Sequence, residues 1–457
     1  MRLYPAFYQE LPVNSGNSTA KPRVLAITAE TFAVRQLRLD MPLCNLKRHG
    51  LIDDYLITDH FFQNLPDDYQ FDTVWVQRMV NEKICGVLAD RIDNNFLYDL
   101  DDFLIGRPTY TMTCFDKNSR WQEAIREALT NCKALTCTTN RLVGMLEACS
   151  GGSLSPKAVI CPNGFEFSKT ARKPQQPAGM VWTSSDFPAL IRSREPLINA
   201  ISKFSEKYEL PVYSFGYFNG SIIGKIRNLV DLGPIPYFHH KALLGSLPPL
   251  IGIAPLETSA DQADLDFINS KSDLKMVEFG GFGHPSVYSD APPYTDTDLR
   301  CGVVAPNDKS SWFDAMEMIF REKWKGLATE QAGVVEARNM DRIASELWYE
   351  AICRVRMERQ LTGSDVKNGF KRSRRTRGGG RGTLGLIASS RKVVDWAAYD
   401  NAYHFWKEYK KKRIVRHEAL KIIDATYGLP LFFALYPLYK IVKPFRKLMR
   451  SLKESIV

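Results

Sequence analysis

The sequence lacks the features that would place it among disulfide-rich, zinc-binding or membrane-spanning proteins. Its nine cysteines are scattered over 457 residues without a Cys-x-x-Cys pair, so we expect reduced thiols in a cytoplasm. No apolar run approaches the roughly 18 residues of a spanning helix, and the N-terminus lacks the apolar core of a secretory signal. The adjacent histidines His239 and His240 would face opposite ways on a strand, so we expect a structural role and no metal site.

Acidic residues are scarce in the last part of the chain. Residues 351–457 carry 25 Lys and Arg against 8 Asp and Glu, a net charge of +17, whereas the rest of the chain has a net charge of −7. A mildly acidic body with a strongly basic tail predicts that the tail contacts an anionic surface.

Apolar residues are plentiful, and they follow an α/β pattern. Short apolar runs that suit buried strands alternate with amphipathic stretches that suit helices, first from Arg23–Thr28 to Ala158–Cys161 and again from Met180–Thr183 to Leu299–Val304. Lys169–Ala178, which is polar and contains two prolines, separates the two series as a linker. The sequence therefore predicts two α/β domains with parallel sheets and a ligand cleft between them.

The stretch 251–290 organises the second series. It predicts a buried strand, then a helix capped by Ser270 or Ser272, then a helix end at Gly280–Gly283 and a further strand at Pro285–Ser289. This is a strand–loop–helix–turn–strand unit, whose helix N-terminus would lie at the ligand-binding edge of the sheet.

Charged residues gather at the start of that expected helix. Lys271 and Lys275 are four residues apart and would share one face near the positive end of the helix dipole, which is a ready phosphate site. Glu278 follows one turn later, where a carboxylate can bind ribose hydroxyls. Alternatively, both lysines are solvated and Glu278 merely pairs with Lys275, because exposed charge pairs are common.

The string NSKSDLKMVEFGGFGHPSVYSD, residues 269–290, resembles the donor-binding segment of GT-B glycosyltransferases related to family 4. In that family a Lys-Ser-x-x-Lys-x-x-Glu helix precedes a small-residue turn, Gly-x-Pro and a strand ending in Ser. The resemblance implies that Glu278 binds the ribose of a nucleotide-sugar. Pro255-Leu-Glu257 matches the strand end before this segment, and Ser270 stands where the wider family carries a second Glu.

The resemblance extends over residues 23–345 in family order. Its further matches are Asp72–Arg78, Leu97–Asp102, Cys137–Leu142, Pro162–Gly164 and Cys301–Trp312. It implies a GT-B fold of two Rossmann-like parallel-sheet domains that face a cleft. The charge and composition of the tail add a basic helical extension. The expected parts are a lead-in (1–22), an acceptor-side domain (23–168), a linker (169–179), a nucleotide-sugar domain (180–330), a return helix (331–360) and the basic extension (361–457).

Three acids end the strand expected at residues 96–100. Asp99, Asp101 and Asp102 could orient an acceptor hydroxyl, take its proton or bind a cation; alternatively they cap a turn. We assign them to the acceptor side as candidate catalytic residues. Arg194, near the first helix of the second domain, would neutralise the leaving diphosphate, as basic residues do in the family. The candidate donor-binding residues are Arg194, Glu257, Ser270, Lys271, Lys275 and Glu278.

The tail combines basic, aromatic and apolar segments. Gln331–Arg359 is predicted to be a long amphipathic helix, which by resemblance crosses back to the first domain. Lys367–Arg381 is basic and glycine-rich, and Asp395–Asp424 is helical with interleaved aromatic and basic residues. The uncharged run Ala425–Tyr439 contains two prolines, so we expect it to lie in the headgroup layer of an anionic membrane. Alternatively, the tail packs on the body or on a partner protein.

These observations predict a cytoplasmic glycosyltransferase, peripheral to the inner face of the cell membrane. By resemblance it transfers a sugar from a nucleotide-sugar donor to a hydroxyl of a polysaccharide or lipid-linked glycan of the cell envelope, with retention of configuration and without a metal or other cofactor. One alternative is a nucleic-acid-binding protein, since Arg- and Gly-rich segments bind phosphates. The apolar run of the tail argues against nucleic acid as a partner, because nucleic acid would not bury it. Another alternative is a catalytically inactive GT-B scaffold.

Overall fold

The computed structural model describes ten stretches of the chain and two single residues between them. They are residues 20–30, 33–59, 65–78, 80–106, 120–167, 171–184, 193–216, 225–233, 237–358 and 360–368, with residues 62 and 235. All of them belong to the first of two compact units, Met1–Gly378. The expected helix at Asp395–Asp424 and the apolar run at Ala425–Tyr439 lie outside the described residues, as does most of the lead-in.

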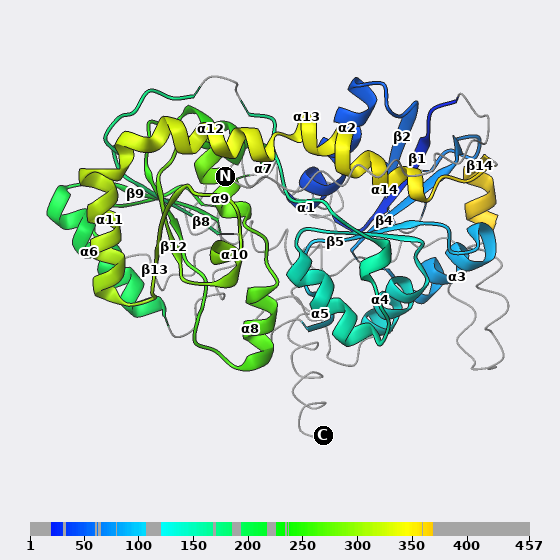
Figure 1. The fold of residues 1–457 in the computed structure, drawn as a ribbon, viewed down its shortest axis with the longest axis horizontal. Coiled ribbons are helices and arrows are strands. Elements are labelled where there is room, and N and C mark those ends of the chain that lie inside the picture. The colour runs from blue at the N-terminus through cyan, green and yellow to red at the C-terminus, as the bar shows by residue number, and fades with distance from the viewer. Residues whose placement is uncertain are drawn as a thin grey trace, which may run out of the picture. The chain divides into compact units, whose positions relative to one another are not determined.

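The first half of the chain forms a sheet of six parallel strands in the order β2-β1-β4-β5-β6-β7 (Figure 1). Its strands are β1 (Arg23–Thr28), β2 (Asp54–Thr58), β4 (Thr73–Gln77), β5 (Leu97–Leu100), β6 (Ala134–Cys137) and β7 (Ala158–Ile160). The helices between them are α1 (Ala33–Arg35), α2 (Met41–Arg48), α3 (Glu82–Ile92), α4 (Arg120–Asn131) and α5 (Asn140–Ser150). A π-helical segment, Gln36–Asp40, joins α1 to α2.

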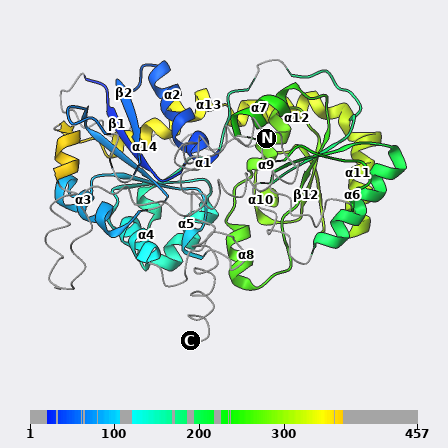
Figure 2. The ribbon, with the colours of Figure 1, turned by 180° about the vertical axis from the view of Figure 1, so that it is seen from behind.

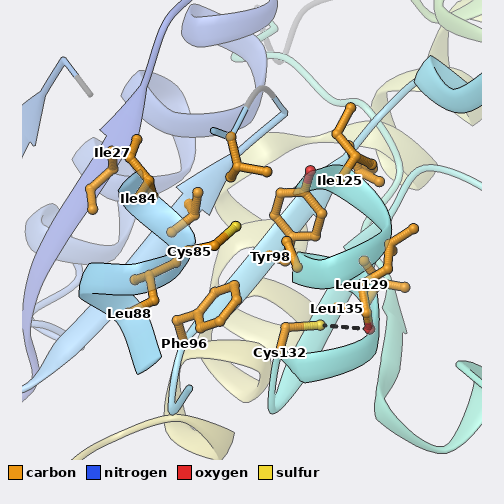
Figure 3. Close-up of a cluster of buried hydrophobic side chains, with 14 of the residues drawn as sticks. Ile27, Ile84, Cys85, Leu88, Phe96, Tyr98, Ile125, Leu129, Cys132 and Leu135 are labelled. Carbon is orange, nitrogen blue, oxygen red and sulfur yellow. Dashed lines mark hydrogen bonds between the residues drawn. The ribbon is translucent and has the colours of Figure 1, made fainter. Parts of the chain in front are cut away.

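Alternate residues of these strands pack against different helix layers, as the period of two along a strand requires. Leu25 and Ile27 of β1 belong to the core beneath α3, α4 and α5, whereas Val24 and Ala26 belong to the core beneath α2 and α14. Figure 3 shows the first of these cores, where side chains of α3 and α4 surround Tyr98 of β5. Both faces of the sheet are therefore covered, which explains why its strands read as continuous apolar runs.

The second half repeats this plan in a sheet ordered β10-β9-β8-β11-β12-β13. The strands are β8 (Met180–Ser184), β9 (Val212–Gly216), β10 (Leu229–Asp231), β11 (Ile251–Ala254), β12 (Ser286–Ser289) and β13 (Gly302–Ala305). The helices are α6 (Arg194–Tyr208), α7 (Tyr237–Ser246), α8 (Gln262–Asn269), α9 (Leu274–Gly281), α10 (Pro292–Thr295) and α11 (Lys309–Arg321). Helices α6 and α11 cover one face of the sheet, and α7, α8 and α9 cover the other. Figure 2 gives the view from behind.

One expectation for the second half is corrected. The apolar run 235–238 predicts a strand from its sequence, but α7 begins at Tyr237 and the edge strand is β10, earlier in the chain. A proline within the run lacks the N–H that a sheet ladder needs and is well suited to the start of a helix. The close approach of β11 to its neighbours is explained by Gly252, where a Cβ would lie 2.1 Å from Ser286 Oγ.

The return segment is helical but interrupted. It consists of α12 (Leu327–Arg338), α13 (Met340–Ile343), a π-helical segment (Ala344–Trp348) and α14 (Tyr349–Arg354), so a single helix over 331–359 is wrong. Asn339 has an extended backbone, and its side chain accepts a hydrogen bond from the Asp341 N–H at 3.0 Å. Trp348 and Ile352 pack in the core of the first sheet.

The final described residues form an antiparallel pair of short strands, β14 (Leu361–Thr362) with β3 (Gln70–Phe71), and a helical turn at residues 363–368. None of the described helices is long and apolar enough to cross a membrane. The two six-stranded parallel sheets, each with helices on both faces and with a returning C-terminal helix, confirm the expected α/β fold of the GT-B type.

Candidate functional site

Polar side chains converge at the carboxyl end of the second sheet. β8 and β9 lie side by side, with Thr183 opposite Phe215, and α7 and α9 pack over the same face of the sheet as Phe215. In open α/β sheets, ligands bind at the carboxyl ends of the strands. We call the group formed by Thr183, Tyr237, His240, Lys275 and Glu278 the carboxylate cluster.

Glu278 is the centre of the carboxylate cluster and is completely buried. Its Oε2 accepts a hydrogen bond from Lys275 Nζ at 2.5 Å, and its Oε1 accepts one from the Tyr237 hydroxyl at 3.0 Å. Lys275 Nζ also donates to Thr183 Oγ1 at 2.7 Å. Burial alone would raise the pKa of Glu278, but the Lys275 charge and the hydrogen bonds hold it below its usual value. The cluster therefore contains a charged carboxylate that only accepts hydrogen bonds.

The first turn of α7 forms a second wall of the cluster. The His240 ring packs against two aromatic rings, with its centroid 5.7 Å from that of Tyr237 and 5.7 Å from that of Phe215. Only 7% of His240 is exposed. Burial lowers the pKa of His240 to about 4, despite the nearby Glu278 carboxylate. The imidazole is therefore neutral at physiological pH. The structural role expected for the histidine pair does not explain why a polar ring is buried here.

The helix that carries Glu278 begins later than expected. Ser270 ends α8 instead, where its hydroxyl donates to the Phe267 carbonyl at 2.8 Å and is completely buried. α9 has Asp273 at its N-terminal boundary. The expectation that Ser270 or Ser272 caps the helix is therefore wrong, because the loop expected before this helix contains α8, and Ser270 lies at the end of α8.

The two lysines consequently lie in different elements. Lys271 is in the connection between α8 and α9, with its Nζ 4.4 Å from the Phe267 ring centroid and 3.8 Å from Asp102 Oδ1. Lys275 lies within α9. The prediction that Lys271 and Lys275 share one helix face is therefore wrong. Both lysines are partly exposed, so each can still meet an anion from solvent.

Glu257 is held in place by a dense set of hydrogen bonds. It is completely buried, and it accepts hydrogen bonds from Ser193 Oγ at 2.6 Å and from the Ser193 N–H at 3.0 Å. The N–H groups of Thr258 and Ser259 donate to Glu257 Oε1 at 3.0 and 3.1 Å. These bonds fix the start of α6, whose first residue is Arg194. Contact of Glu257 or Arg194 with a donor stays a prediction.

The three acids of the first sheet lie in two different environments. Asp99 is completely buried within β5. Its carboxylate accepts hydrogen bonds from Arg38 Nη2 at 2.7 Å and from Thr136 Oγ1 at 2.8 Å. Arg38 is also buried, with its guanidinium 4.4 Å from the Trp348 ring centroid and donating to the Cys161 carbonyl at 2.6 Å. Asp99 thus anchors a buried cation in the core.

Asp101 and Asp102, by contrast, lie beyond β5 and are 12% and 21% exposed. Both accept hydrogen bonds from Arg78, whose Nε is 2.5 Å from Asp101 Oδ1 and whose Nη2 is 2.6 Å from Asp102 Oδ2. Glu30 approaches the same guanidinium at 3.3 Å. Burial alone would lower the pKa of Arg78, but these three carboxylates hold it well above its usual value. We call this group the arginine clasp.

Sequence reasoning missed several residues of these groups. Arg38, Arg78, Tyr237 and His240 were not proposed as site residues, although Arg78 ends one of the matched strings. In the described parts of the chain, no cluster of three or more His, Cys, Asp or Glu side chains could hold a metal ion.

Comparisons with known proteins concern the fold. No protein-family model matches the chain, and no curated protein matches it. Among solved structures, Anabaena HepE with UDP and glucose is similar at 11% identity over 71% of this chain and 98% of that chain, with a TM-score of 0.49. Staphylococcus aureus MnaA with UDP is similar at 10% identity over 71% of this chain and 94% of that chain, with a TM-score of 0.43.

A third similar structure is the pneumococcal O-GlcNAc transferase GtfA with UDP and GlcNAc. Its identity is 13% over 65% of this chain and 59% of that chain, with a TM-score of 0.45. At such identities no residue role passes from these proteins to this chain. The side chains of the carboxylate cluster and the arginine clasp carry the proposals that follow.

Proposed function

We propose that the protein is a glycosyltransferase that uses a nucleotide-sugar donor. The observation that carries this proposal is the buried, charged Glu278 at the carboxyl end of the second sheet, held by Lys275. A buried carboxylate is costly unless it is paired. Placed where α/β sheets bind ligands, an acceptor-only group of this kind suits a ligand that presents hydroxyl donors, such as ribose.

The lysines supply the positive charge that a diphosphate needs. Lys275 lies one turn from Glu278 and also contacts Thr183, so ribose and phosphate groups of one nucleotide can reach the pair together. Lys271, which lies in the connection that leads into α9, is proposed as a second cation for the diphosphate. Cations fixed in this way stabilise the charge that develops on a departing nucleoside diphosphate. We propose that transfer proceeds with retention of configuration and without a metal.

The acceptor hydroxyl is proposed to approach the arginine clasp. Asp101 and Asp102 are partly exposed, whereas Asp99 is sealed in the core by Arg38. A general base must lie within hydrogen-bond reach of the proton that it removes. Asp101 and Asp102 therefore remain candidate catalytic residues, and Asp99 is proposed to position the strand end from which they project.

The acceptor is proposed to be a polysaccharide or lipid-linked glycan at the inner face of the cell membrane. The support is the basic and apolar composition of residues 361–457. The test is sedimentation of the full chain with anionic and neutral vesicles, beside a variant in which Lys410–Arg413 are replaced by Gln. Binding to anionic vesicles that the variant loses supports the proposal. Salt-sensitive binding to RNA without vesicle binding would favour a nucleic-acid partner instead.

Donor binding is tested by thermal unfolding with a panel of nucleoside diphosphate sugars, because a ligand of the folded state raises the midpoint. One sugar nucleotide should raise the midpoint of the wild-type chain. Glu278→Ala should remove the shift, since each hydrogen bond to a charged group contributes about 1.5–3 kcal/mol. Glu336→Ala, at an exposed position in α12, is the matched control. A folded Glu278→Ala protein with an unchanged shift would refute the ribose assignment.

A second candidate function is a GT-B scaffold that binds a nucleotide without turnover. The observation in its favour is that both oxygens of Glu278 already have protein partners, and that Asp101 and Asp102 are both engaged by Arg78. Release of free nucleoside diphosphate from the sugar nucleotide that binds, with and without membrane glycolipid extract, separates the two. Binding without release in either case would favour the scaffold.

A further inference from the structure

His240 carries a polar atom that its surroundings do not satisfy. Its Nε2 is buried and finds no hydrogen-bond partner among the described residues. Leaving a buried polar atom unpaired costs on the order of 1–3 kcal/mol, and buried polar groups in native structures are nearly always paired. Other buried side-chain atoms among the described residues also lack a partner, for example Trp312 Nε1 and Trp348 Nε1. His240 differs from them because the Glu278 carboxylate acts on it, at the ligand-binding end of the sheet.

The ring is held in a defined orientation. Tyr237 and Phe215 both pack against it, and the Tyr237 hydroxyl donates to Glu278 Oε1 at 3.0 Å. The residues of the carboxylate cluster come from β8, α7 and α9, and Phe215 comes from β9. Since four separate elements fix these side chains, the imidazole and the carboxylate present a pre-organised pair of polar groups.

The chemistry of the pair selects a hydroxyl partner. Glu278 repels phosphate and requires a hydrogen-bond donor, whereas a neutral imidazole nitrogen either donates or accepts, according to its tautomer. A hydroxyl group can do both, so a vicinal diol can give one hydroxyl to each. Each carboxylate oxygen has about two acceptor sites, which lets a ligand hydroxyl join Tyr237 at Oε1 without displacing it.

We propose that His240 is a second ribose ligand: its Nε2 hydrogen-bonds one hydroxyl of the nucleotide's ribose while Glu278 accepts a hydrogen bond from the other. This inference rests on the proposed function and deepens it. It makes His240 a determinant of specificity for ribonucleotides over deoxyribonucleotides, because a site built to bond a hydroxyl discriminates against an analogue that lacks it.

The test is titration calorimetry of the full chain with ADP, CDP, GDP and UDP, followed by the 2′-deoxy and 3′-deoxy forms of whichever binds. Two variants are compared with the wild type. His240→Phe keeps a ring against Tyr237 and Phe215 but removes the nitrogens. His239→Phe makes the same change at the neighbouring, exposed position and is the matched control.

His240→Phe should weaken the ribonucleotide by roughly three- to tenfold, the value of one neutral hydrogen bond. One of the two deoxy forms should then bind the variant as well as the ribonucleotide does, whereas His239→Phe should behave like the wild type. Without nucleotide, the unfolding midpoint of His240→Phe should equal or exceed that of the wild type, because an unpaired buried atom has been removed. A purely structural histidine would give a lower midpoint.

Two outcomes overturn the inference, and they are distinguishable. If a nucleoside diphosphate binds and both deoxy forms are disfavoured equally in wild type and His240→Phe, the ribose contact of His240 is refuted while donor binding stands. If no nucleoside diphosphate binds the wild type, the proposed function fails and this inference fails with it. Should His240→Phe not fold, His240→Gln, which keeps a donor and an acceptor, takes its place and should retain the discrimination.

Discussion

Replacing Asp99 by Asn tests whether this acid belongs to the reaction or to the core. The change keeps the size of the side chain but removes its charge, and it leaves the buried Arg38 guanidinium without its counter-ion. Asp99 also accepts a hydrogen bond from Thr136 Oγ1 at 2.8 Å. If Asp99 anchors Arg38, the variant should lose stability; if it is catalytic, it should lose turnover without losing stability.

The expected loss of stability follows from the partners that Arg38 retains. Removing one member of a buried ion pair costs about 3–5 kcal/mol. Arg38 would keep its hydrogen bonds to the Cys161 carbonyl at 2.6 Å and to Asn163 Oδ1 at 3.3 Å, and its stacking on Trp348. We therefore expect a value near the lower end, about 3 kcal/mol, which is roughly a hundredfold in the folded-to-unfolded ratio.

Urea denaturation followed by circular dichroism measures this loss as a shift of the transition midpoint. Asp341→Asn is the control, because Asp341 forms its ion pair with Arg48 at the exposed surface, and exposed pairs contribute only about 0–1 kcal/mol. The double variant Arg38→Met with Asp99→Leu should recover much of the loss, since apolar side chains of similar volume often replace a buried ion pair without penalty.

One result would refute this reasoning. It is an Asp99→Asn protein with the wild-type midpoint and a turnover reduced by a hundredfold or more. Asp99 would then have to reach the substrate, which its burial and its bond to Arg38 do not allow in the arrangement described.

The remaining predictions concern the core of the second domain. Burial lowers the pKa of His284 to about 3, and its Nδ1 accepts a hydrogen bond from the Leu250 N–H. As the pH drops, the imidazole of His284 is protonated in the unfolded state before it is protonated in the folded state, so the free energy of unfolding should fall from about pH 6.5 towards pH 3. Urea midpoints measured against pH should show this fall. His284→Gln should make the dependence of the midpoint on pH weaker. Gly252→Ala should destabilise by about 1–3 kcal/mol, because its Cβ would overlap Ser286 Oγ; an unchanged thermal midpoint would contradict the close approach.

The alternation of strands and helices was readable because each sheet is covered on both faces. Strands such as Val24–Ile27 and Ile251–Ala254 are buried throughout, so they appear as short apolar runs. His284, between Gly283 and Pro285 in the turn before β12, has a structural role, since both ring nitrogens bond backbone groups, Leu250 N–H and Leu244 O. The edge strand β10 escaped notice because Val230 is exposed, and an exposed edge lacks the apolar signal of a central strand.

The pairing of Lys275 with Glu278 was also predictable, because residues three apart share a helix face. The reading of this pair as a solvated one is wrong for Glu278, which is completely buried. Burial depends on what covers α9, and Tyr237 is 41 residues away in the chain. Local spacing therefore predicts the contact but not how deeply it is buried. Burial decides whether the carboxylate is a solvated surface charge or a buried hydrogen-bond acceptor.

The strand-end acids show how a shift of one or two positions separates a core role from a site role. Asp99 lies inside β5, where parallel neighbours on both sides leave its carboxylate facing the helix layer, and only a buried cation can balance it. Asp101 and Asp102 lie beyond Leu100, where the strand has ended and water can enter. The strand expected at 96–100 already predicted that Asp99 lies inside the sheet and that Asp101 and Asp102 lie beyond it. The sequence did not predict which cations pair with these acids. Arg38 and Arg78 are 61 and 23 residues away in the chain, and arginines at many other positions would fit the same sequence pattern.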